Sequence, residues 1–215
     1  MSRVLFKPFF CLLIASSFFG CTVDDIIVPD SERVVPEDYH CFAEEGKVWV
    51  YAAAENADDL HESYRYQIVG DTLLNGKDYK KMYLLEAATY GDSEWHYIGA
   101  VRDTLMKVRF VDRGKRDERL LYDFGLVSGN IVRWYGYILL PTNPPRKYIE
   151  GIMRNVVDVY TSDNKFKDSW VEGIGAAMGV CVSFDPIKKE RSILVKCLDP
   201  RGLRYDCKTN YPEEY

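Results

Sequence analysis

The sequence lacks the short motifs that mark several large classes of enzyme. It has no Gly-x-Ser-x-Gly element, no phosphate-cradling loop of the P-loop or dinucleotide type, and no Cys-x-x-Cys pair. These motifs supply, respectively, an exposed nucleophile, backbone amides for phosphate, and zinc ligands. Histidine is scarce, with 3 in 215 residues, and no His-x-x-x-His spacing occurs. We therefore predict no metal, no cofactor and no enzymatic activity.

An excess of positive charge and a second long apolar run are missing as well. The chain has 28 Lys and Arg against 33 Asp and Glu, a formal net charge of −5. Binding of nucleic acid needs clustered basic side chains, so the composition argues against this partner. The basic run 113–116 is flanked by Asp112, Asp117 and Glu118 and predicts a solvated loop. After residue 20 no apolar run reaches the roughly 20 residues of a membrane-spanning helix.

Residues 1–20 have the pattern of a secretory signal peptide. Arg3 and Lys7 give a basic start, residues 8–19 are uncharged, and Gly20 is a small residue at the expected cut. Cys21 follows directly. This arrangement resembles the lipobox of bacterial lipoproteins, in which the cysteine thiol receives lipid after cleavage. The alternative is an ordinary secreted protein in which Cys21 pairs or stays free.

The lipobox resemblance implies an outer-membrane lipoprotein of the cell envelope. Lipid on Cys21 would tether a soluble domain, with no other contact between the protein and the bilayer. The acidic stretch Thr22–Asp25 is similar to the one that directs Bacteroidetes lipoproteins to the cell surface, which favours a surface-exposed over a periplasm-facing domain. Residues 21–35 predict a flexible tether, and residues 36–215 predict one domain.

Four further cysteines, Cys41, Cys181, Cys197 and Cys207, are candidates for disulfides. The cell envelope permits disulfide formation. Four cysteines allow three pairings, and the sequence does not choose among them. The last three fall on expected neighbouring strands, which favours at least one bridge there. Buried thiols are the alternative.

Alternating apolar and polar residues predict a mainly β fold. Ser63–Val69 places Tyr64, Tyr66 and Ile68 on one face, and Asn75-Gly76 is a strong hairpin turn. We expect an antiparallel meander of roughly ten strands, as a curled sheet or a barrel- or sandwich-like arrangement. One short helix is expected to open at Pro36. Further strands are expected at 47–53, 78–85, 95–101, 107–111, 120–124, 133–140, 152–161, 169–171, 180–184, 193–198 and 203–207, with prolines 141, 144 and 145 in a break.

Two clusters of reactive side chains favour structural interpretations. His40 and Cys41 are adjacent, so on a strand they point to opposite faces and do not form a base–nucleophile pair. The loop at residues 56–62 holds Asp58, Asp59, His61 and Glu62. It lacks the residue order of a calcium loop, so a solvated hairpin connection is favoured over a metal site.

Glu172 is the most distinctive carboxylate. It lies in Trp170–Gly175, where the glycines permit a sharp turn or a close backbone approach. The favoured interpretation is a carboxylate bonded to turn amides. The alternative is one acid of a hydrolase, which would require a second carboxylate across a cleft.

Aromatic side chains are plentiful, with 16 Tyr, 10 Phe and 4 Trp. Trp134, Tyr135, Tyr137 and Tyr148 flank the proline-rich break and are candidates for an exposed platform. Exposed Tyr and Trp can stack on sugar rings or anchor a protein partner. The alternative is that these residues simply suit half-buried strands.

The chain resembles a family of uncharacterised Bacteroidetes secreted lipoproteins. The shared phrases are Glu45–Trp49, Gly70–Thr72, Asn75–Tyr83, Tyr97–Arg102, Leu120–Phe124, Trp170–Gly175 and Cys197–Asp199 with Gly202. The resemblance covers most of residues 45–205 in order and implies a β-rich secreted or surface domain. It implies no activity and no catalytic residues.

Two short phrases, Asp71-Thr72-Leu73 and Asp103-Thr104-Leu105, resemble the pattern of Bacteroides protein O-glycosylation. They make Thr72 and Thr104 candidates for modification, with ordinary Asp turn chemistry as the alternative.

Together these features predict a non-catalytic, lipid-anchored envelope protein that binds a glycan or a protein partner. The alternatives are an assembly accessory of an outer-membrane complex and, less favoured, a carboxylate-dependent hydrolase.

Overall fold

The fold is mainly antiparallel β, as predicted. The computed structural model describes residues 33–54, 61–86, 94–126, 132–134, 137–142, 146–161, 167–177 and 191–206. Its strands are β1 Val48–Ala54, β2 His61–Leu74, β3 Lys77–Glu86, β4 His96–Thr104, β5 Lys107–Asp112, β6 Arg119–Asp123, β7 Val132–Trp134, β8 Tyr137–Thr142, β9 Lys147–Ile149, β10 Ile152–Arg154, β11 Val156–Thr161, β12 Lys167–Val171, β13 Gly175–Ala176, β14 Arg191–Asp199 and β15 Gly202–Asp206. Within this part of the chain, no helix has the length and hydropathy to span a membrane.

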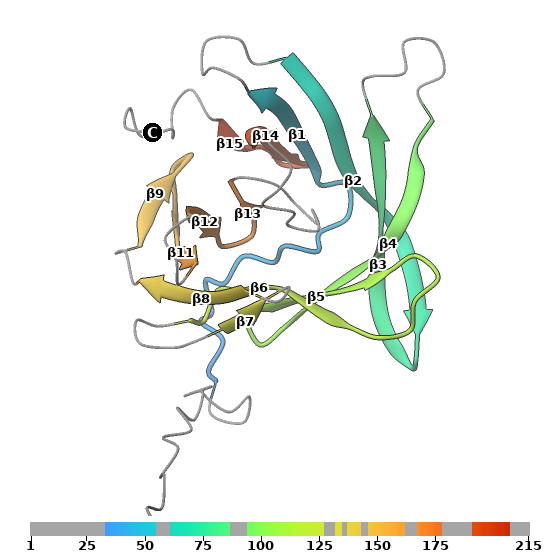
Figure 1. The fold of residues 1–215 in the computed structure, drawn as a ribbon, viewed down its shortest axis with the longest axis horizontal. Helices are drawn as coiled ribbons and strands as arrows, with labels where there is room; N and C mark the ends of the chain where they lie inside the picture. Colours follow the sequence, from blue (N-terminus) through green and yellow to red (C-terminus); the bar gives the residue numbers. More distant parts are fainter. Residues whose placement is uncertain are drawn as a thin grey trace, which may run out of the picture.

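One large sheet curls into a half-barrel (Figure 1). Its eight strands run in the order β15-β14-β1-β2-β3-β4-β5-β6. The meander from β1 to β6 follows from successive hairpins, and the predicted turn at Asn75-Gly76 is confirmed. Both turn residues have positive φ, 51° and 73°, as the two-residue turns that match strand twist require. The C-terminal hairpin β14–β15 returns to pair with β1, a long-range contact that the meander pattern did not indicate.

A smaller sheet, in the order β13-β12-β11-β8-β7, lies on the concave side of the large one, and β9–β10 forms a separate hairpin (Figure 1). The two sheets are joined where the N–H of Leu194 on β14 donates to the carbonyl of Ala177, just after β13, at 2.8 Å. The space between the sheets is therefore the interior of the domain.

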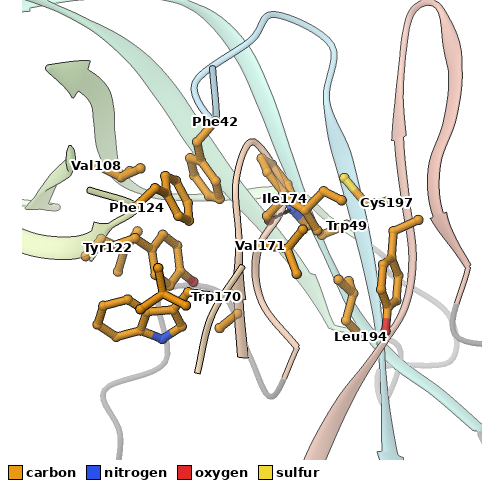
Figure 2. Close-up of a cluster of buried hydrophobic side chains, with 14 of the residues drawn as sticks. Phe42, Trp49, Val108, Tyr122, Phe124, Trp170, Val171, Ile174, Leu194 and Cys197 are labelled. Atoms are coloured by element: carbon orange, nitrogen blue, oxygen red, sulfur yellow. Dashed lines mark hydrogen bonds between the residues drawn. The ribbon is translucent and has the colours of Figure 1, made fainter. Parts of the chain in front are cut away.

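Aromatic side chains fill this interior (Figure 2). The Phe42 ring stacks on Trp49 with centroids 4.8 Å apart and lies 5.4 Å from the Tyr122 ring. Tyr122 in turn meets Trp170 edge-on at 5.5 Å. The predicted inward face of β2 is confirmed, because Tyr66 and Ile68 are buried in this core.

Three expectations about local structure were wrong or partly wrong. The helix at Pro36 is a turn, closed by the Tyr39 N–H bonding to the Pro36 carbonyl at 3.1 Å. The single strand expected at 133–140 is split into β7 and β8. Pro141 lies inside β8, opposite Val159. Proline has no N–H to donate to a ladder, and in the described part of the chain Pro141 is paired on one side only, with Val159 of β11. The strand expected at 180–184 lies outside the described residues.

Candidate functional site

The predicted aromatic platform is placed in part. Tyr148 lies on β9 with 73% of its surface exposed. It stands opposite Met153 in the β9–β10 hairpin, whose tight turn uses positive φ at Glu150 and Gly151. Trp134 and Tyr137 face each other as the last pair of β7 and first of β8. Their side chains, and all of Tyr135, lie outside the described residues, so the platform as a whole stays a prediction.

A second feature was not predicted at all. Residues 33–45, here called the strap, run between the large sheet and the turn after β12 (blue in Figure 1), and Phe42 is the one buried residue among them. Among the described residues, the strap belongs to no strand. The rest of the described chain is here called the body. Backbone hydrogen bonds of the kind found between strands begin at Gly46, whose N–H donates to the Ile68 carbonyl of the body at 3.0 Å. The strap's polar groups must therefore find other partners, because buried backbone amides are rarely left unpaired.

Asp103 on β4 is the first of these partners. Its Oδ1 accepts the N–H of Phe42 at 3.1 Å and its Oδ2 accepts the N–H of Ala43 at 2.6 Å. The Tyr39 hydroxyl also donates to Oδ1, at 2.9 Å. Burial raises the pKa of the Asp103 carboxyl above its ordinary value. Burial and the nearby Asp103 together raise the pKa of the Tyr39 hydroxyl, so that hydroxyl remains a donor.

Glu172, which follows β12, is the second partner and is fully buried. Its Oε1 accepts the N–H of His40 at 2.9 Å, and its Oε2 accepts the side-chain amide of Asn155. The neighbouring Gly173 has φ 71°, and a Cβ there would lie 2.9 Å from His40 Cβ. The structural interpretation of Glu172 holds in part: the carboxylate is buried and hydrogen-bonded, but its described partners are the distant His40 and Asn155 and not the amides of its own turn. The hydrolase alternative loses the residue that motivated it, because this carboxylate is fully buried.

Lys47 is the third partner and is also buried. Its Nζ donates to the carbonyls of Cys41 at 2.6 Å and Gly173 at 2.9 Å, and it forms an ion pair with Glu44 at 3.0 Å. A buried ammonium is tolerated only when such acceptors surround it. Lys47 therefore links the strap to the turn that carries Glu172.

The beginning of the strap is fixed by a buried ion pair. The Arg33 guanidinium donates to both carboxylate oxygens of Asp123, at the end of β6, at 2.5 and 2.8 Å. Arg33 falls within the stretch predicted as tether. On the surface, Asp38 accepts from Arg146 at 2.6 Å, which connects the strap to the segment that carries Tyr148.

Two of the candidate cysteines are described, and both are free thiols: Cys41 is exposed and Cys197 is buried. Burial raises the pKa of both, that of Cys197 to about 12. A raised pKa keeps a thiol protonated and argues against a nucleophilic role. Cys181 and Cys207 lie outside the described residues, so disulfide pairing stays a prediction.

The remaining candidate residues are placed as follows. Thr72 on β2 and Thr104 on β4 are half-buried, and the Asp before each has a partner: Asp71 pairs with Lys80 at 2.6 Å, and Asp103 holds the strap. Their glycosylation stays a prediction. Cys21 and the loop residues Asp58 and Asp59 lie outside the described residues, as do the side chains of His61 and Glu62.

In the described part of the chain, no group of three or more His, Cys, Asp or Glu could hold a metal ion. An open depression of about 360 Å³ lies beside the strap, lined by Ala43, Glu44, Glu45, Lys80, Pro200 and Arg201. Its charged groups are engaged in ion pairs, such as Lys80 with Glu45 at 3.3 Å and Arg201 with Glu44 at 2.7 Å.

The loop at 113–116 is exposed, as predicted, but Glu118 beside it has a specific role on the outer face of the sheet. It accepts from Arg102 Nε at 2.6 Å and from the Tyr79 hydroxyl. The Arg102 guanidinium is the main reason that the pKa of Glu118 falls to about 2. This network covers a small second core formed by Tyr79, Ala100 and Val111.

No protein-family model and no curated protein matches this chain. Its function must therefore be inferred from its own residues.

Proposed function

We propose that this protein is a non-catalytic, lipid-anchored module of the cell envelope that binds a glycan or a protein partner through the face around Tyr148. The observation that carries the proposal is the exposure of this ring. Among the described residues, Tyr148 is the one aromatic side chain in the set of strongly exposed large apolar groups. A large apolar ring held in water on a short hairpin is typical of stacking and anchoring residues.

The surroundings of Tyr148 support a binding role. Arg146, two residues before Tyr148, is exposed and pairs with Asp38 at 2.6 Å, which provides charged and polar groups close in the chain to the ring. Rigid aromatic rings with adjacent polar groups give binding area at low cost in side-chain entropy.

The buried carboxylates support a non-catalytic role. Asp103 and Glu172 are occupied by backbone amides of the strap, and Asp123 is occupied by Arg33. A general acid or nucleophile must reach the substrate, and these three groups are instead used to hold the chain together.

The proposed lipid anchor at Cys21 would hold the domain at the membrane. Lipid on Cys21 would connect to the strap through eleven intervening residues, a length that spans at most about 40 Å. The domain would then remain close to the membrane while its Tyr148 face stays accessible to envelope glycans or proteins.

Binding can be tested with the chain from residue 21 carrying Cys21→Ser, screened by thermal shift against polysaccharides, oligosaccharides and detergent-extracted envelope proteins. A ligand present at a hundred times its Kd should add about 2.7 kcal/mol of stability. Tyr148→Ala should then weaken binding at least tenfold, whereas the matched control Leu203→Ala, an exposed apolar side chain on the edge strand β15 of the large sheet, should not. Equal affinity of the Tyr148→Ala variant and the parent would contradict the proposal.

A role as accessory of an outer-membrane complex is the second candidate. It is favoured by two exposed apolar side chains on β2, Val69 and Leu73, which suit a protein surface better than a sugar. Co-purification of one stable partner, abolished by Leu73→Asp and retained on Tyr148→Ala, would favour this candidate over the first.

A further inference from the structure

The strap is held as a bound peptide is held. Among the hydrogen bonds described, its backbone N–H groups at His40, Phe42 and Ala43 donate to carboxylates of the body, and its Cys41 carbonyl accepts from Lys47. These partners come from β4, the turn after β12, and the residue before β1. These body residues form a site, here called the groove, that binds the strap through its main-chain polar groups, as peptide-binding sites do. The strap is not an extended strand in this site, because it turns at 37–38 and bends at 42–43.

A single aromatic side chain anchors the strap in the groove. Phe42 is fully buried, stacked on Trp49 and close to Tyr122. Gly175 on β13 forms the far wall, and a Cβ at that position would lie 2.8 Å from the Phe42 ring. The groove thus contains a fitted pocket for one aromatic ring between four charged attachment points.

The strap can leave the groove without breaking the sheets. It precedes β1 in the chain and belongs to no strand of either sheet. Its junction with the body is Gly46, where φ is 75° and the ladder to β2 begins. The strand pairing of both sheets lies outside residues 33–45. A segment with these properties is the kind that identical chains exchange.

We propose that the strap is exchangeable between two copies of this chain, so that residues 33–45 of each copy fill the groove of the other and form a two-fold dimer. The segment that occupies the groove in the structure is the strap of the same chain. The strap of a second copy has the same sequence, so it offers the same hydrogen-bonding groups and the same Phe42 ring to the groove. Each hydrogen bond that breaks within one copy forms again between the two copies, and the main cost is that of association. The inference is independent of what Tyr148 binds.

A mixing experiment tests the exchange. Phe42→Ala gives a chain with a weak strap and an intact groove, and Asp103→Asn gives one with an intact strap and a weak groove. Neither variant can form a complete strap–groove pair alone. In an equimolar mixture one complete pair can form, between the intact strap and the intact groove.

The expected result is a heterodimer by light scattering, with at least tenfold recovery of hydrogen-exchange protection at His40, Phe42 and Ala43 in the Asp103→Asn copy. A mixture that stays monomeric with no recovery would overturn the proposal. Circular dichroism of each variant establishes that it is folded.

The wild-type chain provides a second measurement that needs no variant. At millimolar concentration, with reductant present to exclude disulfides through Cys41, it should form a dimer whose strap amides are as protected as in the monomer. A chain that remains monomeric under these conditions, or a dimer with unprotected strap amides, would count against exchange. Neither readout depends on a glycan, so failure here is distinguishable from failure of the binding function.

Discussion

Asp103 holds the backbone of Phe42, a residue 61 positions earlier in the chain, through a hydrogen bond of 3.1 Å. The same carboxylate holds the next amide, that of Ala43. Two consecutive amides are thereby satisfied by one side chain, in a segment that belongs to no strand. Asp103 thus supplies the strap with hydrogen-bond acceptors of the kind that backbone carbonyls of a neighbouring strand supply elsewhere in the molecule.

Replacement of Asp103 by Asn should therefore destabilise the fold. The Asn side chain offers one acceptor where two amides need partners, so one buried N–H loses its bond, at a cost of about 1–3 kcal/mol. Urea unfolding measures this loss. The matched control is Asp71→Asn, in the other Asp-Thr-Leu phrase, where the exposed carboxylate forms an ion pair with Lys80. Equal stability of the two variants would contradict this role for Asp103.

Glu172 should show a graded response to substitution. Glu172→Gln keeps one acceptor and should cost about 1–2 kcal/mol, whereas Glu172→Ala leaves the His40 amide unpaired and opens a cavity, at about 3 kcal/mol or more. Thermal unfolding can rank both variants against Glu37→Gln at an exposed position of the strap. If Glu172→Ala were as stable as the parent, the carboxylate would have no structural role.

The network at Glu118 should make stability depend on acid pH. Its pKa is about 2 in the folded chain, below the ordinary value of 4.5, so the folded state favours the ionised form. The stabilisation is complete above pH 4.5 and is lost as pH falls through about 2. We expect about 1–3 kcal/mol, since the group is partly exposed.

The measurement is the free energy of unfolding of the parent and of Glu118→Gln between pH 7 and pH 2. The two should differ most at neutral pH and converge in acid. A difference that stays constant across this range would show that the carboxylate charge is not the cause.

Gly175 tests the pocket for Phe42. Its φ is 97°, so Gly175→Ala combines backbone strain with a clash against the Phe42 ring. Gly151→Ala is the matched control, since φ there is 74° and no atom lies within 4 Å of the added Cβ. The control should lose about 1–2 kcal/mol from strain alone. Gly175→Ala should lose about 1–3 kcal/mol more from overpacking. Urea unfolding measures both losses of stability. If the two variants lost the same free energy of unfolding, the pocket around Phe42 would be able to expand without cost.

Local pattern predicted most of the individual strands. The alternation at Ser63–Val69 placed Tyr66 and Ile68 in the core, and Asn75-Gly76 gave the β2–β3 turn, because side-chain alternation and positive φ are properties of neighbouring residues. For Glu172 the structural role was interpreted correctly but its partners were not, because the carboxylate accepts from the distant His40 and from Asn155 and not from the amides of its own turn. At Pro36 the same kind of reasoning failed, because proline and acidic residues suit both a helix start and a turn.

The sequence by itself determined the antiparallel strands, their inward faces and the β1–β6 meander, because these depend on residues close together in the chain. Only the tertiary structure decided that β14 pairs with β1, that Phe42 of the strap enters the core, and that Asp103, Glu172 and Lys47 hold the strap. Those contacts join residues up to 150 positions apart, as in the pair Val48 and Leu198. The sequence does not distinguish a carboxylate that binds distant backbone amides from the other acidic residues, because its partners are far away in the chain.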